Sequence, residues 1–417
     1  MSEQDLTLKL ATARWFWSLG SAALLRVPLS TFKATPARGK AAVLELTDLD
    51  VLGVEVDPDF GLHYRIAECK SGRVGALELF WLRGVVEFFG ASGAYLVVAR
   101  EQDRTSSMRD LGARLGLGIL TANDFDRLAD SYRMSSDDVG LFDEAMLKRF
   151  DALLAGTPSG VKELSDYVGR LFWQLPIHRN LEYGISYLEQ AKKGDVRDRG
   201  ILCLIGEHAF RYCLALFAAC EAILKRGLPN LQESLPAYLF GGEHNLREAQ
   251  QRVHALKTLQ QRIEGGDRAD LESVFQELPP YYDSLLELIT RLLRRPDQAT
   301  AMLRTLQTVV VAAFANRRPI TEFVGEPEPL TSKLLLDVIT FLVTAADLDR
   351  SVVTAFESAL HGDTGDAAAE RRDAAISTSD RGRADKSGDP PLSTADDQKL
   401  DKTSSDGGDE LRLPLES

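Results

Sequence analysis

Along residues 1–130, the pattern of hydrophobic and polar residues changes repeatedly between one typical of strands and one typical of helices. Short apolar runs rich in Val, Leu and Ile indicate strands, and apolar residues spaced three or four apart indicate helices. We therefore expect helix, strand, strand, strand, helix, strand, helix and strand in succession. In that order, the segments are 6–25, 24–32, 41–56, 62–69, 72–90, 93–100, 106–116 and 117–125. This succession predicts a layered α/β domain over residues 1–130.

Two details of this domain affect how its strands and helices pack. Between the second and third strands, Asp57, Pro58, Asp59 and Gly61 are turn residues, which predicts a hairpin or another tight connection. In the helix that follows, Leu77, Phe80, Leu82 and Val85 recur with helical spacing. We expect these four side chains to form the buried face of that helix.

The remainder of the chain has a different pattern. Residues 131–360 contain helix-period segments separated by Pro and Gly, which predicts an all-helical domain without a fixed-length repeat. Residues 361–417 contain 14 acidic and 8 basic residues and almost no large apolar ones. Such a segment cannot bury enough apolar surface to fold, so we expect a disordered acidic tail.

Charge and cysteine content narrow the class of protein. The formal net charge of −13 argues against a protein that coats nucleic acid non-specifically. Residues 1–130 are nearly neutral, however, with 17 acidic and 15 basic residues, and a local patch or bound metal can still attract a polyanion. The four cysteines form no CxxC pair, which indicates reduced thiols. Without a recognisable signal peptide or bilayer-spanning run, we expect a cytoplasmic protein with no membrane partner.

Charged residues interrupt the second and third predicted strands. Asp48 and Asp50 lie among Leu and Val, and Glu68 and Lys70 flank Cys69. Side chains alternate along a strand, so Asp48 shares a face with Asp50, and Glu68 shares one with Lys70. If the strands pair, a carboxylate of the first meets Glu68 and Lys70 of the second. A divalent cation would offset the cost of burying these charges, and Mg²⁺ suits one or two carboxylates plus a substrate phosphate.

This arrangement resembles the PD-(D/E)xK, or restriction-endonuclease-like, nucleases over roughly residues 5–130. Asp50, which precedes Val51 and Leu52, is similar to the first acid of the motif, and Glu68 with Lys70 is similar to its Glu-x-Lys pair. The resemblance implies a central mixed sheet flanked by helices and Mg²⁺- or Mn²⁺-dependent cleavage of nucleic acid, with DNA as the expected substrate. It also implies a role in restriction, repair or defence, and homodimers, since cutting both strands needs two sites.

Within that resemblance, Asp50 and Glu68 are the expected metal ligands, and Lys70 positions water as a base or stabilises charge. Many members carry a further acid on the first helix, but this helix offers only Glu3 and Asp5 near its start. A third ligand is therefore absent or comes from Asp48 or Glu45, which favours one metal over two.

Alternative interpretations stay open at this level. The charged hairpin could be a solvated sheet edge, or the fold could have lost catalysis and serve as a scaffold whose helical domain binds a protein. The sequence contains no GxxxxGK[ST] and no GxSxG, the patterns typical of P-loop ATPases and of many serine hydrolases. His63 and the histidines of the helical domain are expected to be structural rather than metal ligands.

Overall fold

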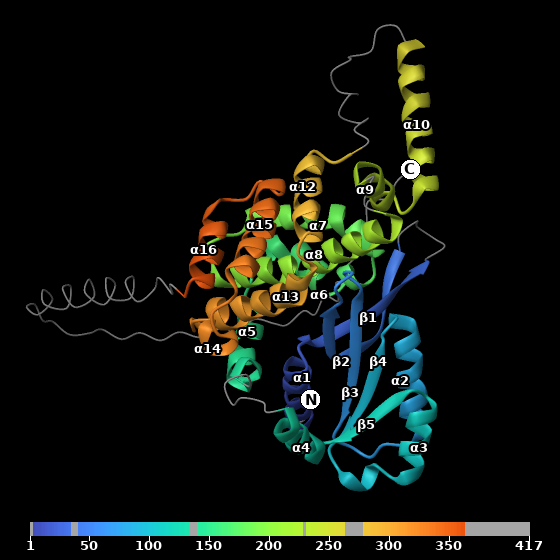
Figure 1. The fold of residues 1–417 in the computed structure, drawn as a ribbon, viewed down its shortest axis with the longest axis vertical. Coiled ribbons are helices and arrows are strands. Elements are labelled where there is room, and N and C mark those ends of the chain that lie inside the picture. Colours follow the sequence, from blue (N-terminus) through green and yellow to red (C-terminus); the bar gives the residue numbers. More distant parts are fainter. Residues whose placement is uncertain (1–2, 35–40, 133–139, 228–230, 263–277, 363–417) are drawn as a thin grey trace, which may run out of the picture. The chain divides into compact units, whose positions relative to one another are not determined.

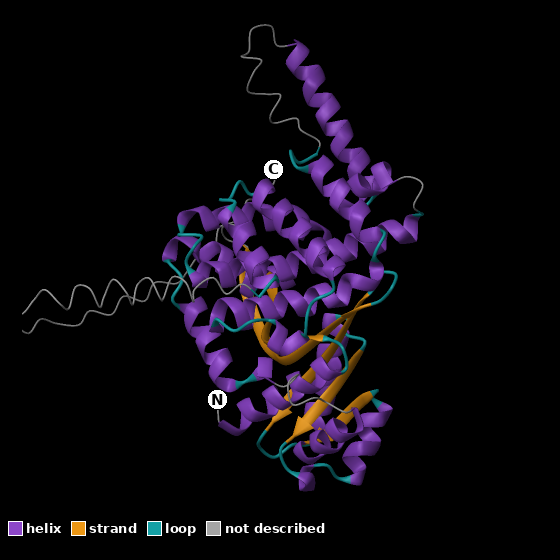
Figure 2. Ribbon diagram, turned by 60° about the vertical axis from the view of Figure 1, so that its left-hand side comes forward, coloured by secondary structure: helices purple, strands orange, loops and turns teal. Residues whose placement is uncertain are grey.

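The computed structural model describes residues 3–34, 41–132, 140–227, 231–262 and 278–362. Within these ranges the chain forms an α/β region that contains a five-stranded sheet, followed by a largely helical region, as predicted. Figure 2 shows the strands gathered in one sheet. The predicted disordered tail lies outside the described residues, apart from its first two positions.

The five strands lie in the sheet in the same order as in the sequence (Figure 1). The strands are β1 (Ala22–Ala34), β2 (Ala41–Val56), β3 (Leu62–Lys70), β4 (Gly93–Val98) and β5 (Leu117–Thr121). β2 and β3 pair antiparallel across the predicted turn, whereas β3, β4 and β5 are parallel. Parallel neighbours need a crossover, and the chain supplies a helix after β3 and another after β4. The predicted mixed sheet is confirmed.

Helices cover both faces of the sheet (Figure 1). One face carries α1 (Glu3–Ser18) and α4 (Ala122–Tyr132), which contact each other. The other face carries α2 (Ala76–Phe89) and α3 (Ser106–Arg114), the two crossover helices. The region therefore has three layers, with its apolar side chains between the sheet and each pair of helices.

Two of the predicted segment ends differ from the structure. The first helix ends at Ser18 rather than near residue 25, because Gly20 adopts a positive φ of 94° and β1 begins at Ala22. The turn expected after Thr121 is the start of α4. Asp124 in the first turn of α4 accepts hydrogen bonds from the backbone N–H of Thr121 (2.8 Å) and its hydroxyl (3.0 Å), which fixes that start.

The predicted buried face of α2 is only half right. Leu82 and Val85 are buried, as expected, together with Leu79 and Val86. Leu77 and Phe80 instead point outward, with 80% and 54% of their surface exposed. Apolar residues occur all around this helix, so its spacing is consistent with more than one buried face.

The helical region is built around α8 (Arg199–Arg226). The other helices are α5 (Glu144–Ala155), α6 (Lys162–Gly169), α7 (Asn180–Leu188), α9 (Leu231–Leu239), α10 (Glu243–Arg262), α12 (Tyr282–Leu293), α13 (Ala299–Thr308), α14 (Thr321–Val324), α15 (Pro329–Ala345) and α16 (Ser351–Leu360), with a π-helical segment η9 (Val309–Phe314) after α13. Among the described residues only α8 has the length and hydropathy of a membrane-crossing helix, and its apolar stretch is completely buried inside the fold. The core helix of a soluble domain has the same properties.

The α/β and helical regions share one hydrophobic core. Side chains of α1 pack with Phe142, Met146, Val311 and Phe323 from the helical region. Polar contacts also join them: the side-chain amide of Gln307 donates to the backbone carbonyl of Ala23 and accepts from its N–H. Residues 1–30 and 45–363 accordingly form one compact unit.

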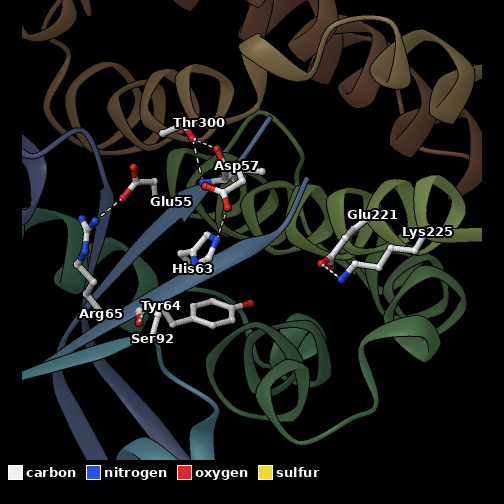
Figure 3. A network of polar contacts seen from close by, with 10 residues as sticks. Glu55, Asp57, His63, Tyr64, Arg65, Ser92, Glu221, Lys225 and Thr300 are labelled. Carbon is white, nitrogen blue, oxygen red and sulfur yellow. Dashed lines mark hydrogen bonds and ion pairs between the residues drawn. The ribbon is translucent and has the colours of Figure 1, made fainter. Parts of the chain in front are cut away.

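A polar network at the turn end of the β2–β3 hairpin adds to this junction (Figure 3). The Thr300 hydroxyl accepts from the N–H of Val56 (3.0 Å) and donates to its carbonyl (3.1 Å). His63 pairs with Asp57, and Arg65 pairs with Glu55 at 2.8 Å. His63 is thus placed away from Glu68 and next to the turn.

Candidate functional site

The β2–β3 hairpin brings Asp50 and Glu68 together. The two strands pair from Val56 opposite Leu62 to Val51 opposite Ala67, so the next position in the register sets Asp50 opposite Glu68. The Asp50 carboxylate then accepts the N–H of Cys69 at 2.7 Å. The predicted meeting of the first carboxylate with the Glu-x-Lys strand is therefore present in the structure.

Glu68 is a buried carboxylate, with 5% of its surface exposed. Its partner is Lys70, whose Nζ lies 2.5 Å from Glu68 Oε1. Burial, together with the negative charge of Asp50, raises the pKa of Glu68 to about 7, against the opposing effect of Lys70. Each of the two buried carboxylates therefore disfavours the charge of the other, and a nearby positive charge lowers that cost.

Asp50 already has a cationic neighbour that the sequence did not reveal. Lys9 on α1 forms an ion pair with Asp50, and both side chains are 9% exposed. Lys9 lies between Leu8 and Leu10, two buried residues of α1. The sequence did contain one indication of this contact. A lysine within an apolar run of a helix is rarely buried unless it is paired with an acid.

Cys69 points to the opposite side from the two residues that flank it. It packs in the core beneath α1, and its sulfur lies 3.6 Å from the Thr12 hydroxyl. Burial raises the pKa of Cys69 to about 12, so this thiol stays protonated and is not a nucleophile. Because side chains alternate along β3, Glu68 and Lys70 share the other face, as predicted.

Lys70 is the exposed member of the group, with 42% of its side chain accessible. Burial acts to lower the pKa of Lys70, but the hydrogen bond and charge of Glu68 outweigh it, so the pKa lies above its ordinary value. Lys70 is therefore an ammonium at neutral pH. It suits stabilisation of negative charge better than proton abstraction.

Asp48 and Glu45, the candidate third ligands, are exposed. Among the residues that the structure describes, no group of three or more His, Cys, Asp or Glu side chains lies close enough to hold a metal ion. The role of Asp48 as a metal ligand stays a prediction. A titration with metal ion tests it, because Asp48→Asn should then weaken the binding.

Asp50 and Glu68 are the two residues that could hold a metal ion at this site. Two carboxylates on adjacent strands, plus waters and a substrate phosphate, are a common set for Mg²⁺. Both oxygens of Asp50 have partners, however: Lys9 on Oδ1 and the Cys69 N–H on Oδ2. A metal held by Asp50 and Glu68 would have to replace the Lys9 ammonium.

Comparison of the chain with protein-family models, with curated proteins and with solved structures found no match. A five-stranded mixed sheet with helices on both faces is compatible with the PD-(D/E)xK fold, but other α/β families share this arrangement. The argument for function therefore depends on the residues of the site.

Proposed function

We propose that the chain is a metal-dependent nuclease that hydrolyses phosphodiester bonds, with DNA as the expected substrate. One observation carries the proposal: Asp50 and Glu68, on adjacent strands, are buried side by side, and the Lys70 ammonium lies at the accessible edge. The sequence similarity to the Asp…Glu-x-Lys motif supports the same assignment.

Each of the three residues has a distinct task in this proposal. Asp50 and Glu68 would hold Mg²⁺ or Mn²⁺, which supplies charge neutralisation at a phosphate and a water of lowered pKa. Lys70, protonated and partly exposed, would hold a phosphate oxygen and stabilise the charge that develops on it. Both carboxylates are buried, and charges interact more strongly away from bulk water, which strengthens both effects.

Cleavage assays test this function. The full chain is incubated with single- and double-stranded DNA and RNA, with and without Mg²⁺ or Mn²⁺, and compared with Lys70→Ala. Loss of one charge-stabilising group in such a site costs on the order of a hundredfold in rate. The expected result is metal-dependent cleavage that falls by about that factor in Lys70→Ala.

Lys225→Ala is the matched control. Lys225 also pairs with a glutamate, Glu221, at 2.5 Å, but it is an exposed residue of α8. Its removal should leave cleavage unchanged. Equal residual activity in the wild type and Lys70→Ala would indicate a contaminating nuclease and contradict the assignment.

The Lys9–Asp50 ion pair favours a second candidate function. Lys9 already neutralises Asp50 within the protein, which is the arrangement expected if the fold has lost its metal and acts as a scaffold. In this alternative the helical region binds a protein partner. The scaffold predicts no effect of Mg²⁺ or Mn²⁺ on stability, with or without Lys9.

A further inference from the structure

Lys9 is a buried lysine to which the nuclease function proposed above gives no task. Its side chain extends from α1 to the Asp50 carboxylate on β2, and both side chains are 9% exposed. A lysine is almost never buried in this way unless it is paired, because a buried ammonium without an anion is costly. If Asp50 binds another cation, Lys9 therefore needs a new anionic partner.

Lys9 acts on both carboxylates of the site. Burial and the charge of Asp50 raise the pKa of Glu68, and the ammonium groups of Lys70 and Lys9 act against that rise. The two lysines reach the carboxylates from different elements, Lys9 from α1 and Lys70 from β3. Lys70 has 42% of its side chain exposed and Lys9 has 9%. One accessible and one buried ammonium therefore lie beside the same pair of acids.

Lys9 occupies a position that a metal ion at Asp50 would need. Asp50 Oδ1 is paired with Lys9, and Oδ2 accepts the N–H of Cys69 at 2.7 Å. The N–H of Cys69 belongs to the backbone of β3 and stays in place. Lys9 can move, because its ammonium is on a flexible four-carbon stem. Of the two partners of Asp50, Lys9 is the one that can leave.

We propose that Lys9 exchanges partners when the site is filled: it pairs with Asp50 in the metal-free protein and, when Asp50 binds a divalent cation, with a phosphate oxygen of the nucleic acid. This inference rests on the proposed nuclease function. Phosphate is the anion that a nucleic acid brings to the site, and a phosphate beside Asp50 and Glu68 lies next to the displaced ammonium. Lys9 is then a second phosphate-binding lysine, on the buried side of the site opposite Lys70.

The exchange makes metal and nucleic acid bind cooperatively. Metal binding alone leaves the ammonium of Lys9 buried without an anion, and phosphate binding alone finds Lys9 still paired with Asp50. When both are present, each removes a cost that the other meets. Each therefore raises the affinity of the other, and by the same factor, since such coupling is reciprocal. This effect adds to the direct attraction between a metal ion and a phosphate.

Binding of Mn²⁺ without nucleic acid tests whether Lys9 competes with the metal. Electron paramagnetic resonance of free Mn²⁺ measures this binding without any turnover. Lys9→Met removes the competing ammonium and should bind Mn²⁺ on the order of tenfold more tightly than the wild type. Lys9→Gln, which keeps a hydrogen-bond donor for Asp50 but no charge, should do the same, and it replaces Lys9→Met if circular dichroism shows that Lys9→Met does not fold.

Lys192→Met is the matched control. Lys192 also pairs with an aspartate, Asp347, at 3.0 Å, but both side chains are exposed and belong to the helical region. Its removal should leave the affinity for Mn²⁺ unchanged.

The affinity for DNA tests whether Lys9 then binds phosphate. A short fluorescent phosphorothioate DNA, single-stranded or duplex, resists cleavage, and its anisotropy gives the affinity with and without Mn²⁺ at constant ionic strength. In the wild type and in Lys192→Met, Mn²⁺ should raise this affinity by about tenfold or more. In Lys9→Met the increase should be several-fold smaller, because only the direct attraction between metal and phosphate remains.

The outcomes separate this inference from the nuclease function. Equal affinity for Mn²⁺ in the wild type and Lys9→Met, or an equal increase in DNA affinity, would overturn the exchange of partners and leave the nuclease assignment in place. Absence of Mn²⁺ binding in both proteins, with and without DNA, would overturn both proposals. Lys9 would then be the permanent partner of Asp50 in a scaffold.

Discussion

Lys9 on α1 and Asp50 on β2 form a buried ion pair, and removing one partner leaves the other charge uncompensated. Breaking such a pair typically costs about 3 kcal/mol. Lys9→Met should therefore lower the free energy of unfolding by roughly that amount in the absence of metal. Lys9→Met/Asp50→Asn, which removes both charges, should be more stable than Lys9→Met alone. Urea unfolding of the three proteins measures these differences.

The same substitution separates the two candidate functions. If Asp50 and Glu68 hold a metal, Lys9→Met frees Asp50, and millimolar Mn²⁺ should raise the melting temperature of this variant more than that of the wild type. If neither protein responds to Mn²⁺, the scaffold interpretation is favoured over the nuclease.

His208, in the middle of α8, makes stability depend on pH. It is completely buried between the rings of Tyr167 and Tyr212, and burial lowers its pKa to about 3. The unfolded chain binds a proton at this histidine below pH of about 6.5, whereas the folded protein does not until near pH 3. Above about pH 6.5, neither state is protonated at His208, and the free energy of unfolding is at its full value. As the pH falls below 6.5, the unfolded chain gains a proton that the folded protein does not, so the free energy of unfolding falls progressively.

Between pH 7.5 and pH 4.5, this effect should lower the free energy of unfolding by about 3 kcal/mol. The lower pH lies about two units below the pKa of histidine in the unfolded chain, and each unit corresponds to about 1.4 kcal/mol. His208→Phe keeps a ring between the tyrosines but cannot bind a proton, so its loss of stability over the same range should be smaller by that amount. His244→Phe, at an exposed position of α10, is the control. If His208→Phe has the wild-type pH dependence, His208 is not buried in its neutral form.

At the scale of elements, two helical glycines that look alike in sequence should respond oppositely to alanine. A Cβ at Gly206 in α8 would lie 2.3 Å from Val310 Cγ2 in η9, whereas a Cβ at Gly169 in α6 meets nothing within 4 Å. Gly206→Ala should lower the free energy of unfolding by about 2 kcal/mol through overpacking. Gly169→Ala should raise it by about 0.5 kcal/mol. Thermal unfolding at one protein concentration measures both, and a stabilised Gly206→Ala protein would contradict this packing of α8 on η9.

The sequence predicted elements better than it predicted their orientation. The strands and the hairpin could be found because β-branched runs and the turn at 57–61 are local properties of the chain. The outward position of Leu77 and Phe80 could not, because α2 is apolar on two sides and only the packed sheet selects one of them. The predicted hairpin was enough to place Asp50 opposite Glu68. The contact of Lys9 with Asp50 depends instead on where α1 packs against the sheet, and no local sequence pattern determines that position.

At the scale of the whole molecule, the α/β region should not unfold separately from the helical region. Phe142, Met146 and Val311 complete the core beneath α1, and Gln307 satisfies both backbone groups of Ala23. Residues 1–132 produced alone would expose that apolar surface and should lack a cooperative transition. The full chain should lose near- and far-ultraviolet circular dichroism together. A folded 1–132 fragment would contradict a shared core.

The central claim is that Asp50 and Glu68 hold a divalent cation, and calorimetric titration of Mn²⁺ into the full chain tests it most directly. The account predicts one Mn²⁺ per chain, with affinity that falls by about tenfold or more in Glu68→Gln. It should be unchanged in Asp110→Asn, which removes an exposed carboxylate of α3. A wild-type protein that binds no Mn²⁺, or a Glu68→Gln protein that binds it equally well, would contradict the claim.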